Sequence, residues 1–168
     1  MIELYLKTAA GSKAAHKRAN SLSVDDCLST GEMRFNEFLF RGGVYDVLYQ
    51  KDYRKVGPLD FAATPDVDYA AVGADALETP SPSHVALIQV ADCTVRKAPE
   101  EARNLILSGV ASKSEGVAFA SIVPSMEGCL SQGSQLKFSK SVLRGVIGEA
   151  LYRLSVRASQ PKTATEDL

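Results

Sequence analysis

The chain has 168 residues, of which 45% are hydrophobic and 23% charged, with 12 glycines and 7 prolines. These proportions are typical of a soluble globular domain and exclude collagen-like and broadly disordered chains, and no apolar run approaches the roughly 18–20 residues that cross a bilayer. The net charge is −1, yet residues 1–55 carry +2, residues 56–133 carry −6 and residues 134–168 carry +3. We predict one globular domain over residues 1–158 and a disordered polar tail over 159–168.

The N-terminal part predicts a strand followed by short helices. Residues 2–8 alternate apolar and polar side chains, which is the period of a strand. Residues 12–20 are small and basic and fit either a short helix or a mobile arm. Ser23, followed by Asp26, resembles a capping box and predicts a short helix over 24–28.

A β-hairpin is expected next. Aromatic and β-branched residues fill 35–40 and 44–49, on either side of Gly42 and Gly43. Paired glycines supply the positive φ that a tight hairpin turn needs. A charged turn follows over residues 51–55.

The middle of the chain predicts loops, two strands and a helix. Residues 60–84 contain three prolines and few large apolar side chains, so we expect loops there with at most one short strand, over 69–72. Residues 85–90 form a nearly continuous apolar run and predict a buried strand. Residues 99–107 begin with proline and two glutamates and predict a helix, and 117–123 predict another strand.

The C-terminal segment leaves helix and strand open. Apolar residues between 142 and 154 recur with helical spacing, although Gly145 and Gly148 would each weaken a helix by roughly 1 kcal/mol. Taken together, the pattern predicts an α+β fold, with an antiparallel sheet or a small β-sandwich flanked by a few helices.

The cysteines predict no cross-link. Cys27, Cys93 and Cys129 are odd in number and widely spaced, without a C-x-x-C pair or a histidine at zinc-finger spacing. We therefore expect reduced, buried thiols in a reducing compartment. The N-terminus has no basic segment followed by an apolar one, so we expect a cytoplasmic protein.

Catalytic motifs are missing from the sequence, which predicts that the protein is not an enzyme and uses no cofactor or metal. The best nucleophile candidate is Cys93, but the neighbouring Asp92 would raise its pKa and oppose activation. A small enzyme that uses these two residues stays a third hypothesis. The aspartates at 60, 66 and 68 offer oxygen ligands for a divalent cation, but we prefer to interpret them as a solvated acidic loop.

Nucleic-acid binding has more support. Cations can contact phosphates, and tyrosines can stack on bases, as in single-strand-binding proteins. The alternatives are a solvated charged surface and tyrosines that pack over the edge of a core. The candidate residues are Lys13, Lys17, Arg18, Tyr45, Tyr49, Lys51, Arg54, Lys55, Arg144, Arg153 and Arg157.

One region of the sequence is similar to a known family. A Tyr/Val-rich run ends at Gly73, an apolar run ends at Asp92, Arg96 follows, and then come an acidic helix, Gly109 and a run that ends at Pro124. In this order residues 69–132 resemble the conserved region of the thirty-kilodalton superfamily of plant-virus movement proteins. The resemblance implies a jelly-roll-like β domain without catalysis, which binds single-stranded nucleic acid and enlarges plasmodesmata. It also implies structural roles for Asp92, as the family aspartate at a strand end, and for Arg96.

Our leading hypothesis is a virus-encoded, non-enzymatic protein that binds single-stranded nucleic acid, with RNA expected, in the host cytoplasm or the virion. It requires cations from both ends of the chain to converge on one surface. The alternative is a viral structural, assembly or genome-packaging protein that acts as a homo-oligomer. In that case the apolar stripe at Val142, Val146, Leu151 and Leu154 would dock on a partner, unless it belongs to the core of its own domain.

Overall fold

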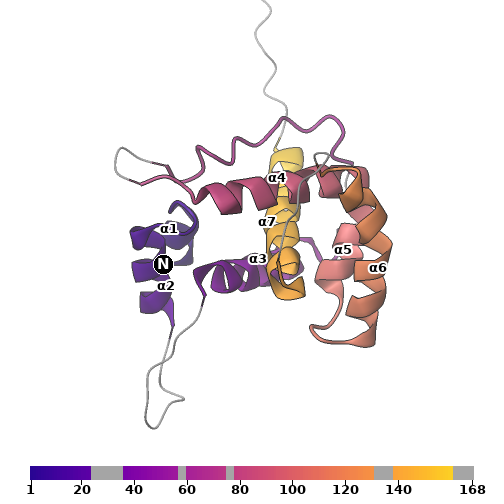
Figure 1. Cartoon of the computed structure of the whole chain (residues 1–168), viewed down its shortest axis with the longest axis horizontal. Coiled ribbons are helices and arrows are strands. Elements are labelled where there is room, and N and C mark those ends of the chain that lie inside the picture. Colours follow the sequence, from indigo (N-terminus) through magenta and orange to yellow (C-terminus); the bar gives the residue numbers. More distant parts are fainter. Residues whose placement is uncertain (24–35, 57–59, 75–77, 131–137, 161–168) are drawn as a thin grey trace, which may run out of the picture.

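The structure is a computed structural model that describes residues 1–23, 36–56, 60–74, 78–130 and 138–160 (Figure 1). These residues contain helices and no β-strand, so the predicted α+β fold with a sheet or sandwich is wrong. The helices in the described residues are α1 (Ile2–Leu6), α2 (Lys13–Leu22), α3 (Glu37–Tyr53), α4 (Pro82–Lys97), α5 (Pro99–Leu107), α6 (Lys113–Glu127) and α7 (Lys140–Ser159).

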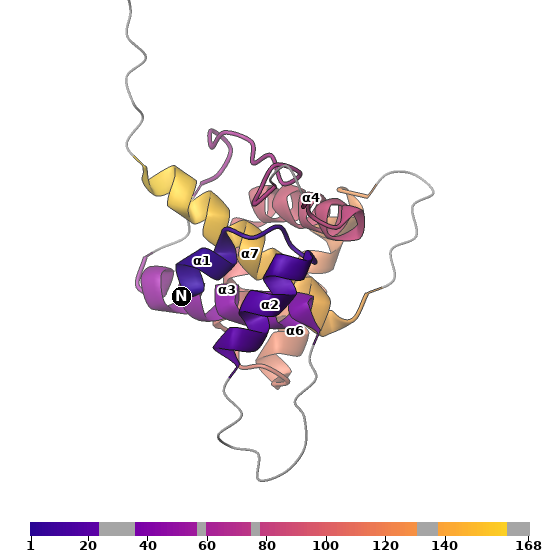
Figure 2. The ribbon, with the colours of Figure 1, turned by 90° about the vertical axis from the view of Figure 1, so that its left-hand side faces the viewer.

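Helix α7 forms the centre of the molecule and packs against α3, α4 and α5. Figure 1 shows α1 and α2 at one end of the long axis and α5 and α6 at the other, and Figure 2 shows α1 and α2 from that first end, in front of α7. Residues 142–154, for which the sequence left helix and strand open, are helical, in agreement with the spacing of their apolar side chains. Its apolar stripe belongs to the core, since Val146, Leu151 and Leu154 are all buried.

The segments expected to be strands are helical. Residues 2–8, 85–90 and 117–123 lie in or around α1, α4 and α6. A short apolar run cannot distinguish a buried strand from a buried helix. In α4 the longer window decides, because the buried residues His84, Ile88, Ala91 and Val95 recur at three- and four-residue spacing. Residues 69–72 form turns instead of a short strand.

The predicted hairpin is the single helix α3, and Gly42 serves close packing. A Cβ atom on Gly42 would lie 2.5 Å from the Cα atom of Gly145 on α7. The two helices therefore cross with their backbones nearly in contact, which side chains at this point would prevent. Gly42 therefore marks a helix crossing, and neither Gly42 nor Gly43 forms a turn.

Other local predictions have mixed outcomes. The helix over 99–107 is confirmed as α5. Residues 12–20 form part of α2, which Ser12 caps by accepting a hydrogen bond from the amide of Ala15. The helix predicted over 24–28 lies outside the described residues. The predicted tail begins too early, since Ser159 still ends α7, and residues 161–168 are not described.

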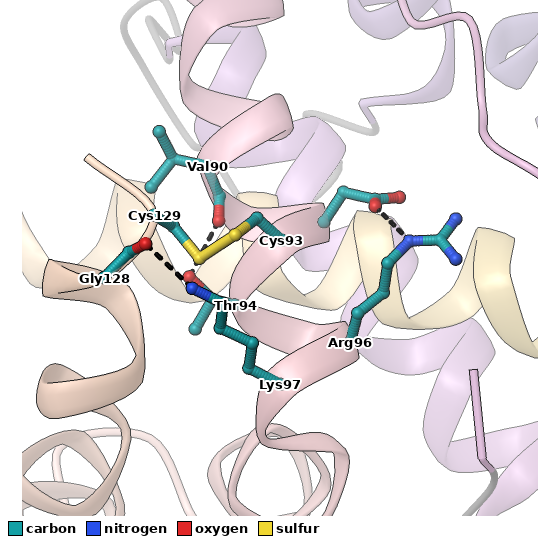
Figure 3. Close-up of a disulfide and its surroundings, with 8 residues drawn as sticks. Val90, Cys93, Thr94, Arg96, Lys97, Gly128 and Cys129 are labelled. Carbon is teal, nitrogen blue, oxygen red and sulfur yellow. Dashed lines mark hydrogen bonds and ion pairs between the residues drawn. A yellow bond between two sulfur atoms is a disulfide. The ribbon is translucent and has the colours of Figure 1, made fainter. Parts of the chain in front are cut away.

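A disulfide joins two cysteines that the sequence predicts to be reduced (Figure 3). Cys93 on α4 and Cys129, just after α6, have Cα atoms 5.9 Å apart. The expectation of reduced thiols is therefore wrong for this pair, because only the packing of α6 beside α4 brings the two residues together. Cys27 lies outside the described residues.

Candidate functional site

The predicted cations on α2 form one exposed group. Lys13 and Lys17 lie one turn apart on the outer side of the helix, and Arg18 is exposed beside them. The inner side packs through Ala15 and Ala19 against the cluster around Tyr5. Within the described residues, no carboxylate forms an ion pair with these three cations. Helix α2 therefore presents positive charge to solvent.

A second predicted group lies elsewhere. The C-terminal end of α3 exposes Lys51, Arg54 and Lys55. Helix α2 instead packs against the first half of α3, near Phe40 and Val44. Arg54 is about 20 Å from Phe40 along the helix, given a rise of about 1.5 Å per residue. The two groups consequently do not form one surface.

Three predicted residues are buried and engaged inside the protein. Tyr45 and Tyr49 are each 2% exposed, so neither ring is placed to stack on a base. Arg144 is 5% exposed and forms ion pairs with Asp46, at 2.8 Å, and Glu115, at 2.9 Å. Its guanidinium also donates to carbonyls at the C-terminal end of α5, so Arg144 connects α7 to α3, α5 and α6.

Cations from both ends of the chain do meet in one cleft. This cleft, here called the α1–α7 cleft, has a volume of about 630 Å³. It lies between α1, the C-terminal half of α7 and the 65–72 segment. Its lining comprises Glu3, Leu6, Lys7, Tyr45, Pro65, Val67, Val72, Tyr152, Arg153, Val156, Arg157 and Gln160.

The charges in the α1–α7 cleft differ in how far they are compensated. Arg153 is paired with Glu149, to which its Nε donates at 3.0 Å. Arg157 donates to the carbonyls of Pro65 and Asp66, which are neutral acceptors. Among the described residues, neither Arg157 nor Lys7 has a carboxylate within ion-pair distance, and Glu3 is the one acid in the lining. The cleft thus combines apolar walls with positive charge at its edge.

The wall formed by residues 65–72 is held by Asp92 and Arg96. Asp92 lies on α4 rather than at a strand end, accepts a hydrogen bond from Tyr69 at 2.7 Å and pairs with Arg96 at 2.6 Å. Arg96 also donates to the carbonyls of Phe61, Thr64 and Pro65. These contacts fasten the loop to α4 and so position Val67 and Val72 in the cleft.

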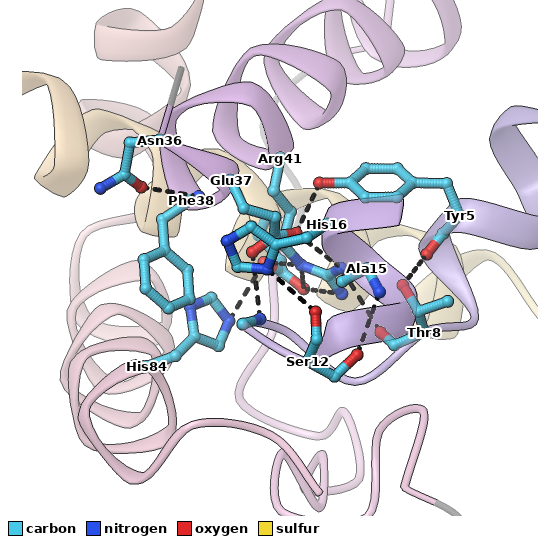
Figure 4. A network of polar contacts seen from close by, with 12 residues as sticks. Tyr5, Thr8, Ser12, Ala15, His16, Asn36, Glu37, Phe38, Arg41 and His84 are labelled. Carbon is cyan, nitrogen blue, oxygen red and sulfur yellow. Dashed lines mark hydrogen bonds and ion pairs between the residues drawn. The ribbon is translucent and has the colours of Figure 1, made fainter. Parts of the chain in front are cut away.

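A buried polar network lies behind the cleft (Figure 4). Tyr5 donates to Glu37 at 2.7 Å, and the amide of Gly11 donates to the same carboxylate at 3.0 Å. Arg41, 1% exposed, pairs with Glu149 at 3.1 Å. The network therefore ties α1, α3 and α7 to one another.

The carboxyl of Glu149 is the centre of this network. Arg41, Arg153 and His84 all contact it, with His84 Nε2 at 3.4 Å. Burial alone raises the pKa of Glu149, but Arg41, the hydrogen bond from His84, and Arg153 outweigh burial and hold that pKa well below its usual range. The group is therefore an ionised carboxylate inside the protein.

The sequence reasoning did not identify Glu37, Arg41, His84 or Glu149. The available signal was the four-residue spacing of Glu37 with Arg41 and of Glu149 with Arg153, which places each pair on one side of a helix. The predicted hairpin prevented us from recognising the first pair, because only in a helix are residues four positions apart neighbours on one side.

The described residues contain neither a membrane-spanning helix nor a cluster that could hold a metal. None of the helices has the length and hydropathy to cross a membrane. No group of three or more His, Cys, Asp or Glu side chains in these ranges is arranged to hold a metal ion.

Comparison with family models, curated proteins and solved structures gave no match for this chain. The resemblance to movement proteins implies strands in segments that α4 and α6 occupy. The jelly-roll-like fold is therefore absent from the described residues, and the family assignment stays a hypothesis based on the residue pattern alone.

Proposed function

We propose that the protein binds single-stranded nucleic acid, with RNA as the expected ligand, and that the α1–α7 cleft receives one nucleotide of the strand. The observation that carries this proposal is the convergence of Lys7, from the N-terminal region, with Arg157, from the C-terminal helix, beside an apolar wall. A role in viral cell-to-cell movement would be one use of this binding, and it rests on the sequence resemblance.

The chemistry of the cleft suits a nucleotide. Lys7 and Arg157 offer positive charge that no described carboxylate neutralises, as a phosphate requires. Val67, Val72 and the ring of Tyr152 offer apolar surface to a base. Tyr45 forms part of the lining, but its ring is already covered by Arg153, whose guanidinium lies 5.2 Å from the ring centroid.

Helix α2 extends the positive surface. It packs against α1, and α1 contributes Glu3, Leu6 and Lys7 to the cleft. Lys13, Lys17 and Arg18 can therefore contact phosphates that flank the bound nucleotide. Lys51, Arg54 and Lys55, at the far end of α3, take no part in this proposal.

The test is fluorescence anisotropy with a labelled single-stranded RNA over a series of salt concentrations. Replacing Lys7 and Arg157 by glutamine removes two proposed phosphate contacts. The negative slope of log K against log salt should then become less steep by about 1.4, and affinity at 0.1 M salt should fall about 25-fold from counter-ion release alone. The matched control carries Lys51→Gln and Arg54→Gln, which change the net charge equally and should leave the slope unchanged.

Two results would overturn the proposal. In the first, the control loses as much affinity as the cleft variant, which would show that net charge alone attracts RNA. In the second, RNA does not bind at low salt while dodecyl phosphate does. The cleft would then be a site for a small amphipathic anion.

A further inference from the structure

Helix α6 presents an apolar face to solvent, with a charged residue at each end. Its inner side packs Ala118, Phe119 and Ile122 into the core, whereas Val117 is 68% exposed and Val123 is 36% exposed. We call the exposed residues Lys113, Val117, Ala120, Val123, Pro124 and Glu127 the α6 outer face. Figure 1 shows that α6 forms one edge of the molecule.

The spacing on the α6 outer face matches a helix-pairing seam. Residues 113, 117, 120, 124 and 127 alternate steps of four and three, as the core positions of a coiled coil do. The one charged residue between the ends, Glu115, is held by buried Arg144 at 2.9 Å. The exposed seam therefore carries charge only at its two ends.

The α6 outer face also contains two pairs of residues that are symmetric about Ala120. Val117 and Val123 are equidistant from it in sequence, and so are Lys113 and Glu127, which have opposite charges. In the described residues neither Lys113 nor Glu127 has an ion-pair partner within its own chain. An antiparallel copy of the same helix would bring each lysine opposite a glutamate and each valine opposite a valine.

From this complementarity we propose that two copies of the chain pair through α6, antiparallel about a two-fold axis at Ala120. A two-fold interface uses the same surface on both subunits, so the pattern must complement itself under reversal, as this one does. The small side chain at the axis lets the helices approach closely. A parallel arrangement would instead oppose Lys113 to Lys113.

Neighbouring charges favour the same orientation. An open groove of about 850 Å³ runs between α5 and α6, with Glu100, Glu101 and Val117 in its lining. Because α5 and α6 form a hairpin, these two glutamates lie toward the C-terminal half of α6. The cation Lys97 is also at that end, but its ammonium donates to the carbonyl of Gly128 at 2.8 Å. The acidic end would receive Lys113 of the second copy.

The expected dimer is weak. Helix α6 has 15 residues and is about 22 Å long, so the paired faces are smaller than a standard interface of about 1,600 Å². We expect dissociation at micromolar concentrations. Since α1 and α2 lie at the other end of the long axis, pairing leaves the α1–α7 cleft accessible, and this inference does not depend on the proposed function.

Sedimentation velocity of the full chain from about 1 to 500 μM tests the pairing. The unaltered protein should change from monomer to dimer over this range, and Val117→Glu should remain monomeric because it places two carboxylates near the axis. The matched control is Val47→Glu on α3, since Val47 is 66% exposed and outside the seam, and it should dimerise normally. Circular dichroism checks that each variant is folded.

Charge reversal tests the antiparallel geometry. Lys113→Glu alone and Glu127→Lys alone should each weaken self-association, because each opposes like charges at both ends. An equimolar mixture of the two variants should form a heterodimer, since every end pair is then attractive. A wild-type chain that stays monomeric at 500 μM, loss of the dimer in Val47→Glu, or no heterodimer in the mixture would overturn the proposal.

Discussion

Glu149 shows how a single buried carboxylate depends on its partners. Its exposed fraction is 2%, and three basic side chains from three helices contact it. A carboxylate in this position is stable only because Arg41 and Arg153 compensate for the loss of water. If the carboxylate is removed, the two guanidiniums remain buried with less compensation.

We therefore predict that Glu149→Gln lowers the free energy of unfolding by about 3–5 kcal/mol at pH 7. The decrease of the free energy of unfolding at acidic pH should change as well. The pKa of Glu149 is lowered in the folded protein, so its stabilising contribution is present above the unfolded value of about 4.5 and is lost as the pH falls below it. In urea unfolding between pH 3 and pH 7, the free energy of unfolding of the variant should depend less on pH.

The control for this measurement is Glu100→Gln. Glu100 is exposed in the first turn of α5, where a carboxylate contributes at most about 1 kcal/mol through the helix dipole. If the free energy of unfolding falls equally steeply with decreasing pH in Glu149→Gln and in the unaltered protein, Glu149 is not a stabilising carboxylate with a lowered pKa.

Helix packing accounts for most of what the sequence failed to predict. Gly42 and Gly43 look equivalent in the sequence, and both fit a hairpin turn. Their roles diverge only because α7 crosses α3 at Gly42, a contact between residues about a hundred positions apart. By contrast, Pro99 and the following glutamates define the start of α5 locally, so that helix was predictable.

In the candidate site, too, the packing of the helices decides what the local sequence does not. Charge asymmetry led us to expect that Lys13, Lys17 and Arg18 would converge with the C-terminal arginines. Arg153 and Arg157 line the α1–α7 cleft, but the N-terminal cation beside them is Lys7, and the three cations of α2 are not in its lining. Arg144 has the same charge and follows from the same reasoning, yet it faces inward to Asp46 and Glu115. Composition cannot distinguish these two arginines, because their burial is set by where α7 lies relative to α5 and α6.

The two glycines of α3 provide the element-scale prediction. Gly42→Ala should lower the free energy of unfolding by about 1–3 kcal/mol, because its methyl group would lie 2.5 Å from Gly145 Cα and force the helices apart. Gly43→Ala has no atom within 4 Å of its added Cβ, so it should raise stability by up to about 1 kcal/mol through helix propensity. Parallel urea titrations compare the two variants. If the free energy of unfolding changes with the same sign in both, α3 and α7 do not cross closely at Gly42.

At the scale of the whole molecule, the disulfide connects the C-terminal end of α6 to α4. Cys93 and Cys129 are separated by 36 positions, and the bond closes the chain that contains α5 and α6 into a loop. Disulfides persist chiefly in oxidising environments. The bond therefore differs from the reduced thiols predicted for this pair, and the predicted cytoplasmic location stays a hypothesis.

The loop length gives a measurable prediction. In the chain-entropy description, closing a loop of this size restricts the unfolded chain enough to stabilise the fold by about 4 kcal/mol. The double variant Cys93→Ser and Cys129→Ser should lose stability of that order, whereas Cys27→Ser should keep the bond. Thiol titration of the denatured, non-reduced protein should detect one thiol per chain from Cys27, and three after reduction. If three thiols react without a reductant, the bond does not form in solution, and α6 is then held beside α4 by its core contacts and by the Lys97–Gly128 hydrogen bond.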